Sequence, residues 1–166
     1  MFQPVFCEAL LHRAKQLALH TCVETCGCCE YSTLARIAPD ADLFLYDWKE
    51  SDPQRHLRHC GVSNALILSN LQKLHDAGKH VQLRCPIIPG INDRPDHFQG
   101  IARLIRSLPN LKGVELMAYH RLGEGKMTRF GLDARSRFQT AEPEPEQMRR
   151  WIAEMRALGV ALTNRA

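Results

Sequence analysis

The chain has 166 residues, a formal net charge of +4 and seven cysteines. This length fits one domain with a real core, but it is short for a complete eight-unit barrel, which needs about 200 residues or more. The mild positive charge argues against nucleic-acid binding, the apolar runs are too short to cross a membrane, and an odd number of cysteines with no secretory signal predicts reduced thiols in the cytoplasm.

Strand-like and helix-like patterns alternate along the chain. Strands are predicted at Leu19–Glu24, Leu43–Asp47, His80–Ile88 and Gly113–Tyr119, with a short final one at Val160–Leu162. Helices are predicted in the intervals 4–17, 32–37, 53–60, 64–77, 93–108 and 148–158. Asp52, Ser63 or Asn64, and Asp93 are the predicted helix caps. Residues 121–145 are rich in glycine, proline and charge, and such a long irregular loop is usually functional.

Repeated strand–helix alternation indicates an α/β fold with parallel strands. Four apolar runs each end on an ionisable residue; they are Leu19–Glu24, Leu43–Asp47, Val81–Arg84 and Val114–His120. Parallel strands point the same way, so Glu24, Asp47, Arg84 and His120 are expected to meet at the carboxyl edge of the sheet, which we call the mouth. Folds of this kind keep their chemistry at that edge. The alternative is that these are ordinary ion-pairing residues at strand ends.

Side chains alternate between the two faces of a strand, so each strand predicts which residues accompany the mouth residues. If Arg84 points into a barrel, Gln82 does too, whereas Leu83 faces the helices. If His120 points inward, Leu116 does as well.

The cysteines suggest a second motif, because Cys22, Cys26 and Cys29 have the spacing Cys-x3-Cys-x2-Cys that is typical of iron–sulfur ligation. Cluster ligands must converge from one loop, whereas Cys22 lies in the strand that presents Glu24, so we interpret this spacing as coincidental. A zinc site formed by Cys26, Cys28 and Cys29 remains an alternative.

Several segments resemble one enzyme family in order and spacing. They are Val23-Glu24-Thr25-Cys26-Gly27, Asp42-Leu43-Phe44-Leu45-Tyr46-Asp47-Trp48-Lys49, Gly61-Val62-Ser63-Asn64, Arg84-Cys85-Pro86-Ile87-Ile88-Pro89-Gly90-Ile91-Asn92-Asp93, and Tyr119-His120-Arg121-Leu122-Gly123-Glu124-Gly125-Lys126. Over most of residues 1–126 the chain is similar to the activating enzymes of glycyl radical enzymes, such as the pyruvate formate-lyase activating enzyme.

This resemblance implies a radical S-adenosylmethionine enzyme, an oxidoreductase built on a partial (β/α)6 barrel. In this family a 4Fe–4S cluster, held by a cysteine loop after the first strand, cleaves S-adenosylmethionine to a 5′-deoxyadenosyl radical that takes hydrogen from a glycine of the partner enzyme. Met1-Phe2-Gln3-Pro4 resembles the segment immediately after the family's Gly-Gly-Glu-Pro motif. Residues 1–166 are therefore expected to form one incomplete barrel domain, a C-terminal portion that lacks the first two strand units and the 4Fe–4S ligands and is inactive alone.

The resemblance also implies roles for the mouth residues. The cofactor-binding residues are expected to be Asp47, Trp48, Lys49, Arg84 and His120. The segment from Asp47 to Lys49 would hold the methionyl carboxylate, and His120 would lie near the ribose and the partner's glycine loop. Glu24 and Asp47 would hold a monovalent cation, helped by backbone carbonyls of Thr25 and Trp48.

Two other functions fit parts of the sequence. One is a cysteine-rich metal-binding module around Gly27, and the other is a sugar-phosphate barrel enzyme, which would need a glycine-rich phosphate loop before a helix. If the family resemblance holds, the strand Leu19–Glu24 loses its neighbour and leaves an open edge, so this chain is expected to form homodimers in addition to binding a glycyl radical enzyme.

Overall fold

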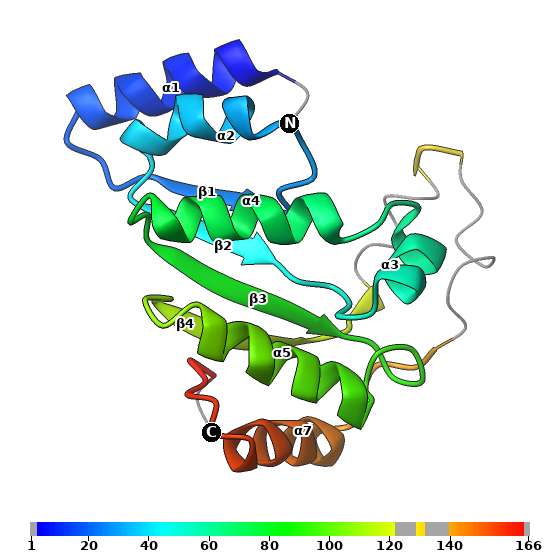
Figure 1. Ribbon diagram of the computed structural model, residues 1–166. Coiled ribbons are helices and arrows are strands. Elements are labelled where there is room, and N and C mark those ends of the chain that lie inside the picture. Colours follow the sequence, from blue (N-terminus) through cyan, green and yellow to red (C-terminus); the bar gives the residue numbers. More distant parts are fainter. Residues whose placement is uncertain (1–2, 122–128, 132–139, 165–166) are drawn as a thin grey trace.

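The computed structural model describes residues 3–121, 129–131 and 140–164. Its centre is a sheet of four parallel strands in the order β1 (Cys22–Thr25), β2 (Leu43–Asp47), β3 (Val81–Ile87) and β4 (Gly113–Ala118). The helices are α1 (Pro4–Gln16), α2 (Tyr31–Ile37), η1 (Ala38–Asp40), α3 (Pro53–Cys60), α4 (Ala65–Asp76), α5 (Pro95–Ser107) and α7 (Pro145–Ala157). The predicted α/β alternation with parallel strands is confirmed (Figure 1).

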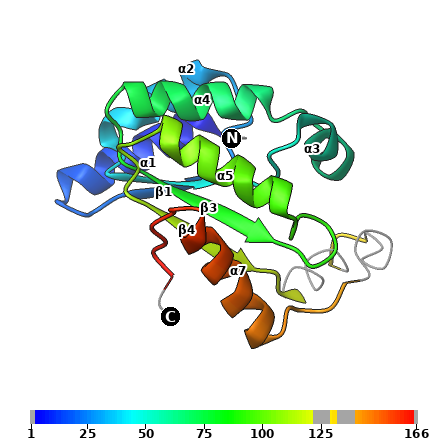
Figure 2. The ribbon, with the colours of Figure 1, turned by 60° about the horizontal axis from the view of Figure 1, so that its bottom comes forward.

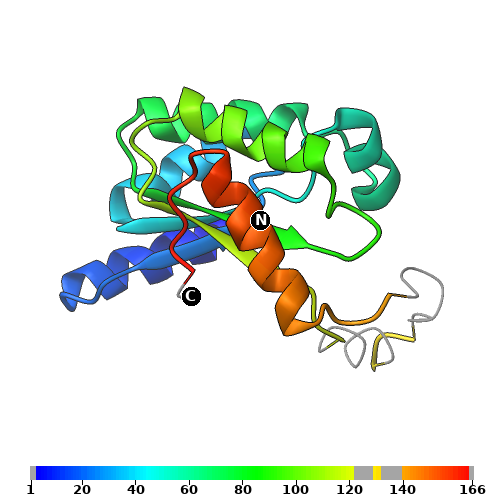
Figure 3. The ribbon, with the colours of Figure 1, turned by 90° about the horizontal axis from the view of Figure 1, so that it is seen from below.

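The two faces of the sheet have different environments. One face is apolar and buried beneath helices; Phe44 and Tyr46 of β2 and Leu83 of β3 are fully buried there. Figures 2 and 3 show α4 and α5 together on this side of the sheet. The residues that alternate with them, such as Leu45 and Arg84, are half-buried on the opposite face. This second face corresponds to the interior of the predicted barrel.

Local signals explain where several helices begin and end. Asp52 caps α3 as predicted, because its carboxylate accepts the backbone N–H groups of Gln54 and Arg55 at 2.8 Å. The predicted cap of α5 is wrong: this helix begins at Pro95, and the carboxylate of Asp93 accepts the N–H of Gly90 at 2.7 Å instead. The Asp93 oxygen that was predicted to cap the helix therefore stabilises a turn in the preceding loop.

The facing of β3 is as predicted, but that of β4 is wrong. Leu83 is fully buried on the helix side, and Arg84 faces the other way. In β4, however, Leu116 is buried on the helix side, and Glu115 faces Arg84. Arg84 and Glu115 are register partners, and paired residues of neighbouring strands share a face, so Leu116 cannot point inward.

The last part of the chain contributes one helix and one bridge. Leu162 pairs with Val114 in an isolated parallel bridge, which is what remains of the predicted final strand. Residues 122–128 and 132–139, most of the predicted loop 121–145, lie outside the described residues. In the described ranges no helix is both long and apolar enough to span a bilayer.

Candidate functional site

Arg84 is the central cation of the mouth. Its Nη1 lies 2.7 Å from Oε1 of Glu24 on β1, and its Nε lies 3.6 Å from Oε2 of Glu115 on β4. Its register partner on β2 is Asp47. The structure therefore brings together Glu24, Asp47 and Arg84, as the strand pattern predicted. The buried Nε of Arg84 has no hydrogen-bond partner among the described residues.

Asp47 and Lys49 form the second charged pair of the mouth. The Nζ of Lys49 lies 3.7 Å from Oδ2 of Asp47, and the lysine side chain is 43% exposed. Burial raises the pKa of the Asp47 carboxyl, and the Lys49 ammonium opposes this rise only in part. The neighbouring carboxylate of Glu24 raises the pKa of Asp47 further. A cation bound at the mouth would therefore favour the charged form of Asp47.

Trp48 contributes its backbone to the mouth and its side chain to the core. Its N–H donates to the carbonyl of Arg84 at 2.8 Å, which continues the β2–β3 pairing beyond the end of β2. The indole is buried on the helix side, and its Nε1 donates to Oγ of Ser51 at 3.2 Å. Only the backbone of Trp48 therefore remains near Asp47 and Lys49.

His120 lies at the rim of the mouth, apart from the charged cluster. It is exposed and lies two residues beyond the end of β4. The preceding residue, Tyr119, donates its N–H to the carbonyl of Ile87 at 3.0 Å, which extends the β3–β4 pairing. Among the described residues no ion pair joins His120 to Glu24, Asp47 or Glu115. The segment 122–126, which carried part of the resemblance, lies outside the described residues.

The cysteines near Gly27 are separated by the end of β1. Cys22 lies inside β1, as predicted, whereas Cys26, Cys28 and Cys29 come after the strand in a loop. Burial raises the pKa of the Cys29 thiol, which disfavours the thiolate that binds metals. No three His, Cys, Asp or Glu side chains within the described ranges are grouped so that they could hold a metal ion.

A small cavity lies beside Lys49, at the exits of β2 and β3. It has a volume of about 210 Å³ and a mainly apolar lining that includes Pro86, Ile88 and Ile91. Lys49 and Asn92 add polar groups to this lining.

The polar residues behind the mouth were not predicted from the sequence. Glu50, Asn92 and His97 are almost fully buried, although all three are polar or ionisable. For Glu50 and Asn92 the only sequence signal was a position next to a predicted turn, which is normally a place for solvated side chains. His97 lies inside the predicted helix 93–108, where nothing in the sequence distinguished it. Glu115 was missed for a different reason: the inward phase of β4 was set from His120, although Val114 and Leu116 were the apolar pair.

Sequence comparisons find relatives among activating enzymes. No family model matches the chain. The choline trimethylamine-lyase activating enzyme of Oleidesulfovibrio alaskensis is 38% identical over 134 residues, which are 79% of this chain and 43% of that protein. The isethionate sulfite-lyase activating enzyme of Nitratidesulfovibrio vulgaris is 42% identical over 128 residues, 75% of this chain and 40% of that protein.

Solved structures extend the comparison to the fold. A domain of the pyruvate-formate lyase-activating enzyme from Bacteroides vulgatus superposes with a TM-score of 0.79 at 24% identity, covering 99% of this chain and 92% of that one. A radical SAM methyltransferase from Sphaerobacter thermophilus gives 0.60 at 19% identity, over 90% of this chain and 42% of that one. The chain spans about two fifths of the length of the curated relatives that it matches. The relatives that it matches are activating enzymes of glycyl radical enzymes, and its four parallel strands superpose on part of the fold of these solved structures.

Proposed function

We propose that this chain forms the part of a radical S-adenosylmethionine barrel that holds the methionyl end of the cosubstrate. The whole enzyme would be an oxidoreductase that activates a glycyl radical enzyme of the pyruvate formate-lyase kind. The observation that carries this proposal is that two cations flank Asp47: Lys49, whose Nζ lies 3.7 Å from Oδ2 of Asp47, and Arg84, its register partner on β3. Seven free thiols support a cytoplasmic location.

The donor set of the mouth fits the amino-acid end of S-adenosylmethionine. A carboxylate accepts charge-assisted hydrogen bonds from lysine and arginine, and the buried Nε of Arg84 lacks a partner among the described residues. The carboxylate of Asp47 suits the ammonium of the same ligand. With its cluster, bound S-adenosylmethionine supplies a radical that removes hydrogen from glycine. The described residues of this chain do not fit the cluster itself, because they hold no group of three metal ligands.

A monovalent cation is the second ligand that we propose for the mouth, between Glu24 and Asp47. Two carboxylates are hard oxygen donors, and a bound cation would oppose the rise in the pKa of Asp47 that burial and the charge of Glu24 cause. The carboxylate of Glu24 is paired with Arg84 at 2.7 Å in this structure. Binding of the cation would therefore require Glu24 to exchange Arg84 for the ion.

His120 is the residue that we propose to face the partner. Its exposed position beyond the end of β4 places it at the rim, where the glycine-bearing loop of a glycyl radical enzyme would approach the ribose of the cosubstrate. The homologues named above are activating enzymes for different partner enzymes, so the partner that we propose is a class, the glycyl radical enzymes.

The proposal is tested by measuring S-adenosylmethionine affinity with calorimetry in Lys49→Ala. Loss of one charge-assisted contact should weaken binding roughly ten- to a hundredfold, while thermal stability barely changes because the Lys49 side chain is 43% exposed. Lys112→Ala removes an exposed lysine at the opposite edge of the sheet and should change neither quantity. Unfolding of Lys49→Ala with unchanged affinity would show that Lys49 is structural.

A further inference from the structure

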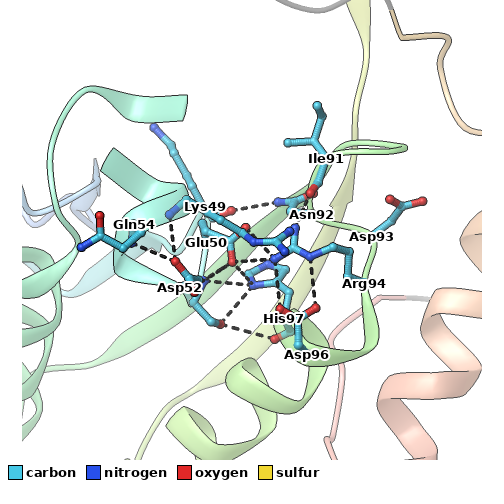
Figure 4. Close-up of polar contacts among 12 residues, drawn as sticks. Lys49, Glu50, Asp52, Gln54, Ile91, Asn92, Asp93, Arg94, Asp96 and His97 are labelled. Carbon is cyan, nitrogen blue, oxygen red and sulfur yellow. Dashed lines mark hydrogen bonds and ion pairs between the residues drawn. The ribbon is translucent and has the colours of Figure 1, made fainter. Parts of the chain in front are cut away.

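A buried ion pair lies directly behind the turn after β2. The Nη2 of Arg94 donates to Oε2 of Glu50 at 3.0 Å and to Oε1 at 3.2 Å, and the Glu50 side chain is only 3% exposed (Figure 4). The same Oε1 accepts the backbone N–H groups of Ser51 at 2.8 Å and Asp52 at 3.0 Å. A buried ion pair adds little net stability by itself. Through its contacts with the N–H groups of Ser51 and Asp52, however, this pair fixes the course of the turn.

Asn92 joins the same turn to the neighbouring strand. Both N–H groups of its side-chain amide donate, one to the carbonyl of Lys49 and one to that of Pro86, each at 2.8 Å. Its Oδ1 accepts the N–H of Ile88 at 2.7 Å. The side chain thus connects the exits of β2 and β3, and Figure 4 shows it next to Lys49. Because both N–H groups and the oxygen of this buried amide are hydrogen-bonded, its orientation is fixed. Its bond to the carbonyl of Lys49 therefore restrains the backbone at Lys49.

Helix α5 completes this frame. The N–H of Ser51, which already donates to Glu50, also lies 3.1 Å from Nδ1 of His97. The same nitrogen lies 3.0 Å from Oγ of Ser51, so the ring contacts both the backbone and the side chain of this residue. A Cβ atom on Gly100 would lie 2.4 Å from the side chain of Ser51, so the absence of a side chain at Gly100 allows the turn to pack against the helix.

These contacts restrain the backbone of Lys49 and of the turn that follows it, and none of them involves the ammonium group of Lys49. The Nζ of Lys49 reaches the opposite way and lies 3.7 Å from Asp47 in the mouth. We infer that Asn92, supported by the Glu50–Arg94 pair, is a positioning residue that holds Lys49 toward an anionic group of the ligand. This inference rests on the proposed function, in which that group is the methionyl carboxylate. Fixing the backbone in advance reduces the conformational entropy that binding would otherwise cost.

The first test is a double-mutant cycle of S-adenosylmethionine affinity for Asn92→Ala and Lys49→Ala. Asn92→Ala is expected to weaken binding roughly three- to tenfold in the wild-type background and to have no further effect when Lys49 is already alanine. Asn70→Ala is the matched control, because Asn70 is equally buried and also donates to two backbone carbonyls, those of Gly27 and Cys29. An equal loss of affinity in both backgrounds would overturn the inference.

The second test needs no ligand. Backbone amides of residues 49–52 should exchange with solvent at least about tenfold faster in Asn92→Ala than in Asn70→Ala, since only the first change releases this turn. Unchanged protection of residues 49–52 would overturn the inference. If Asn92→Ala does not fold, Glu50→Gln keeps the shape of the carboxylate and an acceptor for the turn, removes the charge that faces Arg94, and is expected to give the same pattern.

The two proposals fail in different ways. If the protein does not bind S-adenosylmethionine, or if Lys49→Ala leaves its affinity unchanged, the proposed function is wrong. Amide exchange then decides alone whether Asn92 holds the Lys49 turn. If Lys49→Ala weakens binding and Asn92→Ala leaves both affinity and exchange unchanged, the proposed function stands and the positioning role is wrong.

Discussion

Among single residues, His97 makes folding sensitive to acid. Burial lowers the pKa of its ring from 6.5 to about 4, although the negative charge of Glu50 opposes this shift; Arg94 lowers the pKa, and Asp96 raises it. The ring accepts the N–H of Ser51 only while it is neutral. An unfolded chain has no such restriction and takes up a proton near pH 6.5.

Because the folded pKa lies below the unfolded one, the stability that depends on neutral His97 is fully present above pH 6.5. We expect it to be lost as the pH falls from about 6.5 to about 4, up to roughly 3 kcal/mol. Urea denaturation at a series of pH values measures this slope. His97→Gln should flatten it within this window, and His20→Gln, at an exposed position before β1, should leave it unchanged. A slope that persists in His97→Gln would assign the effect to other groups.

Cys22 gives a second expectation at this scale. Since it lies within β1 and burial raises the pKa of the Cys29 thiol, anaerobic reconstitution of this chain with iron and sulfide should give no stoichiometric cluster and no reductive cleavage of S-adenosylmethionine. Iron and sulfide analysis with a cleavage assay measures both. Cleavage that is present in the wild type and lost in Cys22→Ser would mean that Cys22 is a ligand after all.

The predictability of the site depends on how each residue is positioned. Glu24, Asp47 and Arg84 could be brought together from the sequence, because each ends an apolar run and parallel strands point the same way. Arg84 nevertheless lies in the middle of β3, where it is the register partner of Asp47. Glu50, Asn92 and His97 could not, since their burial depends on contacts between the β2 turn, the β3 turn and α5. Such contacts join segments distant in sequence and leave no local periodicity.

Among the helices, α5 depends on Gly100 for its approach to the β2 turn. In Gly100→Ala the new methyl group would lie 2.4 Å from Ser51, so the helix or the turn must move. Overpacking of this kind costs about 1–3 kcal/mol, and the higher helix propensity of alanine offsets up to about 1 kcal/mol of it. We expect a net loss of stability, together with faster amide exchange at residues 49–52.

The control for this change is Gln99→Ala in the same helix. Gln99 is exposed, so the substitution keeps the helix and adds no contact with Ser51. Thermal unfolding and amide exchange compare the two variants. Equal stability of both would indicate that the turn accommodates a methyl group without strain.

The elements themselves were largely predictable. β1 to β4 could be predicted from apolar runs, and α3 from Asp52 and Pro53 at its start and Gly61, with a φ of 79°, after its end. The face of β4 was predicted wrongly because the alternation of its side chains was counted from His120, which lies beyond the end of the strand. Past Ala118 the chain has left the regular pleat, so the alternation of β4 does not extend to His120.

The whole molecule presents an uncovered side at β1 and α1. In the described sheet β1 pairs only with β2, and apolar side chains of α1 lie in solvent, with Phe6 61% and Leu10 56% exposed. Open strand edges and apolar patches favour association. We therefore expect this chain to form dimers or larger species at micromolar concentration, measured by sedimentation velocity.

Substitutions at this side test that expectation. Phe6→Lys places a charge on α1 and should shift the distribution toward monomer. Leu57→Lys is the matched control, because Leu57 is similarly exposed but lies on α3. A monomeric wild type, or an equal response of both variants, would show that α1 is not an association surface.

The order of the strands in space is the same as their order along the chain, from β1 to β4. Each strand therefore pairs with the next one made, and no later segment has to pass between strands already paired. Because β1 is the edge of the described sheet, a further strand–helix unit can pair there without any loop threading between the existing strands.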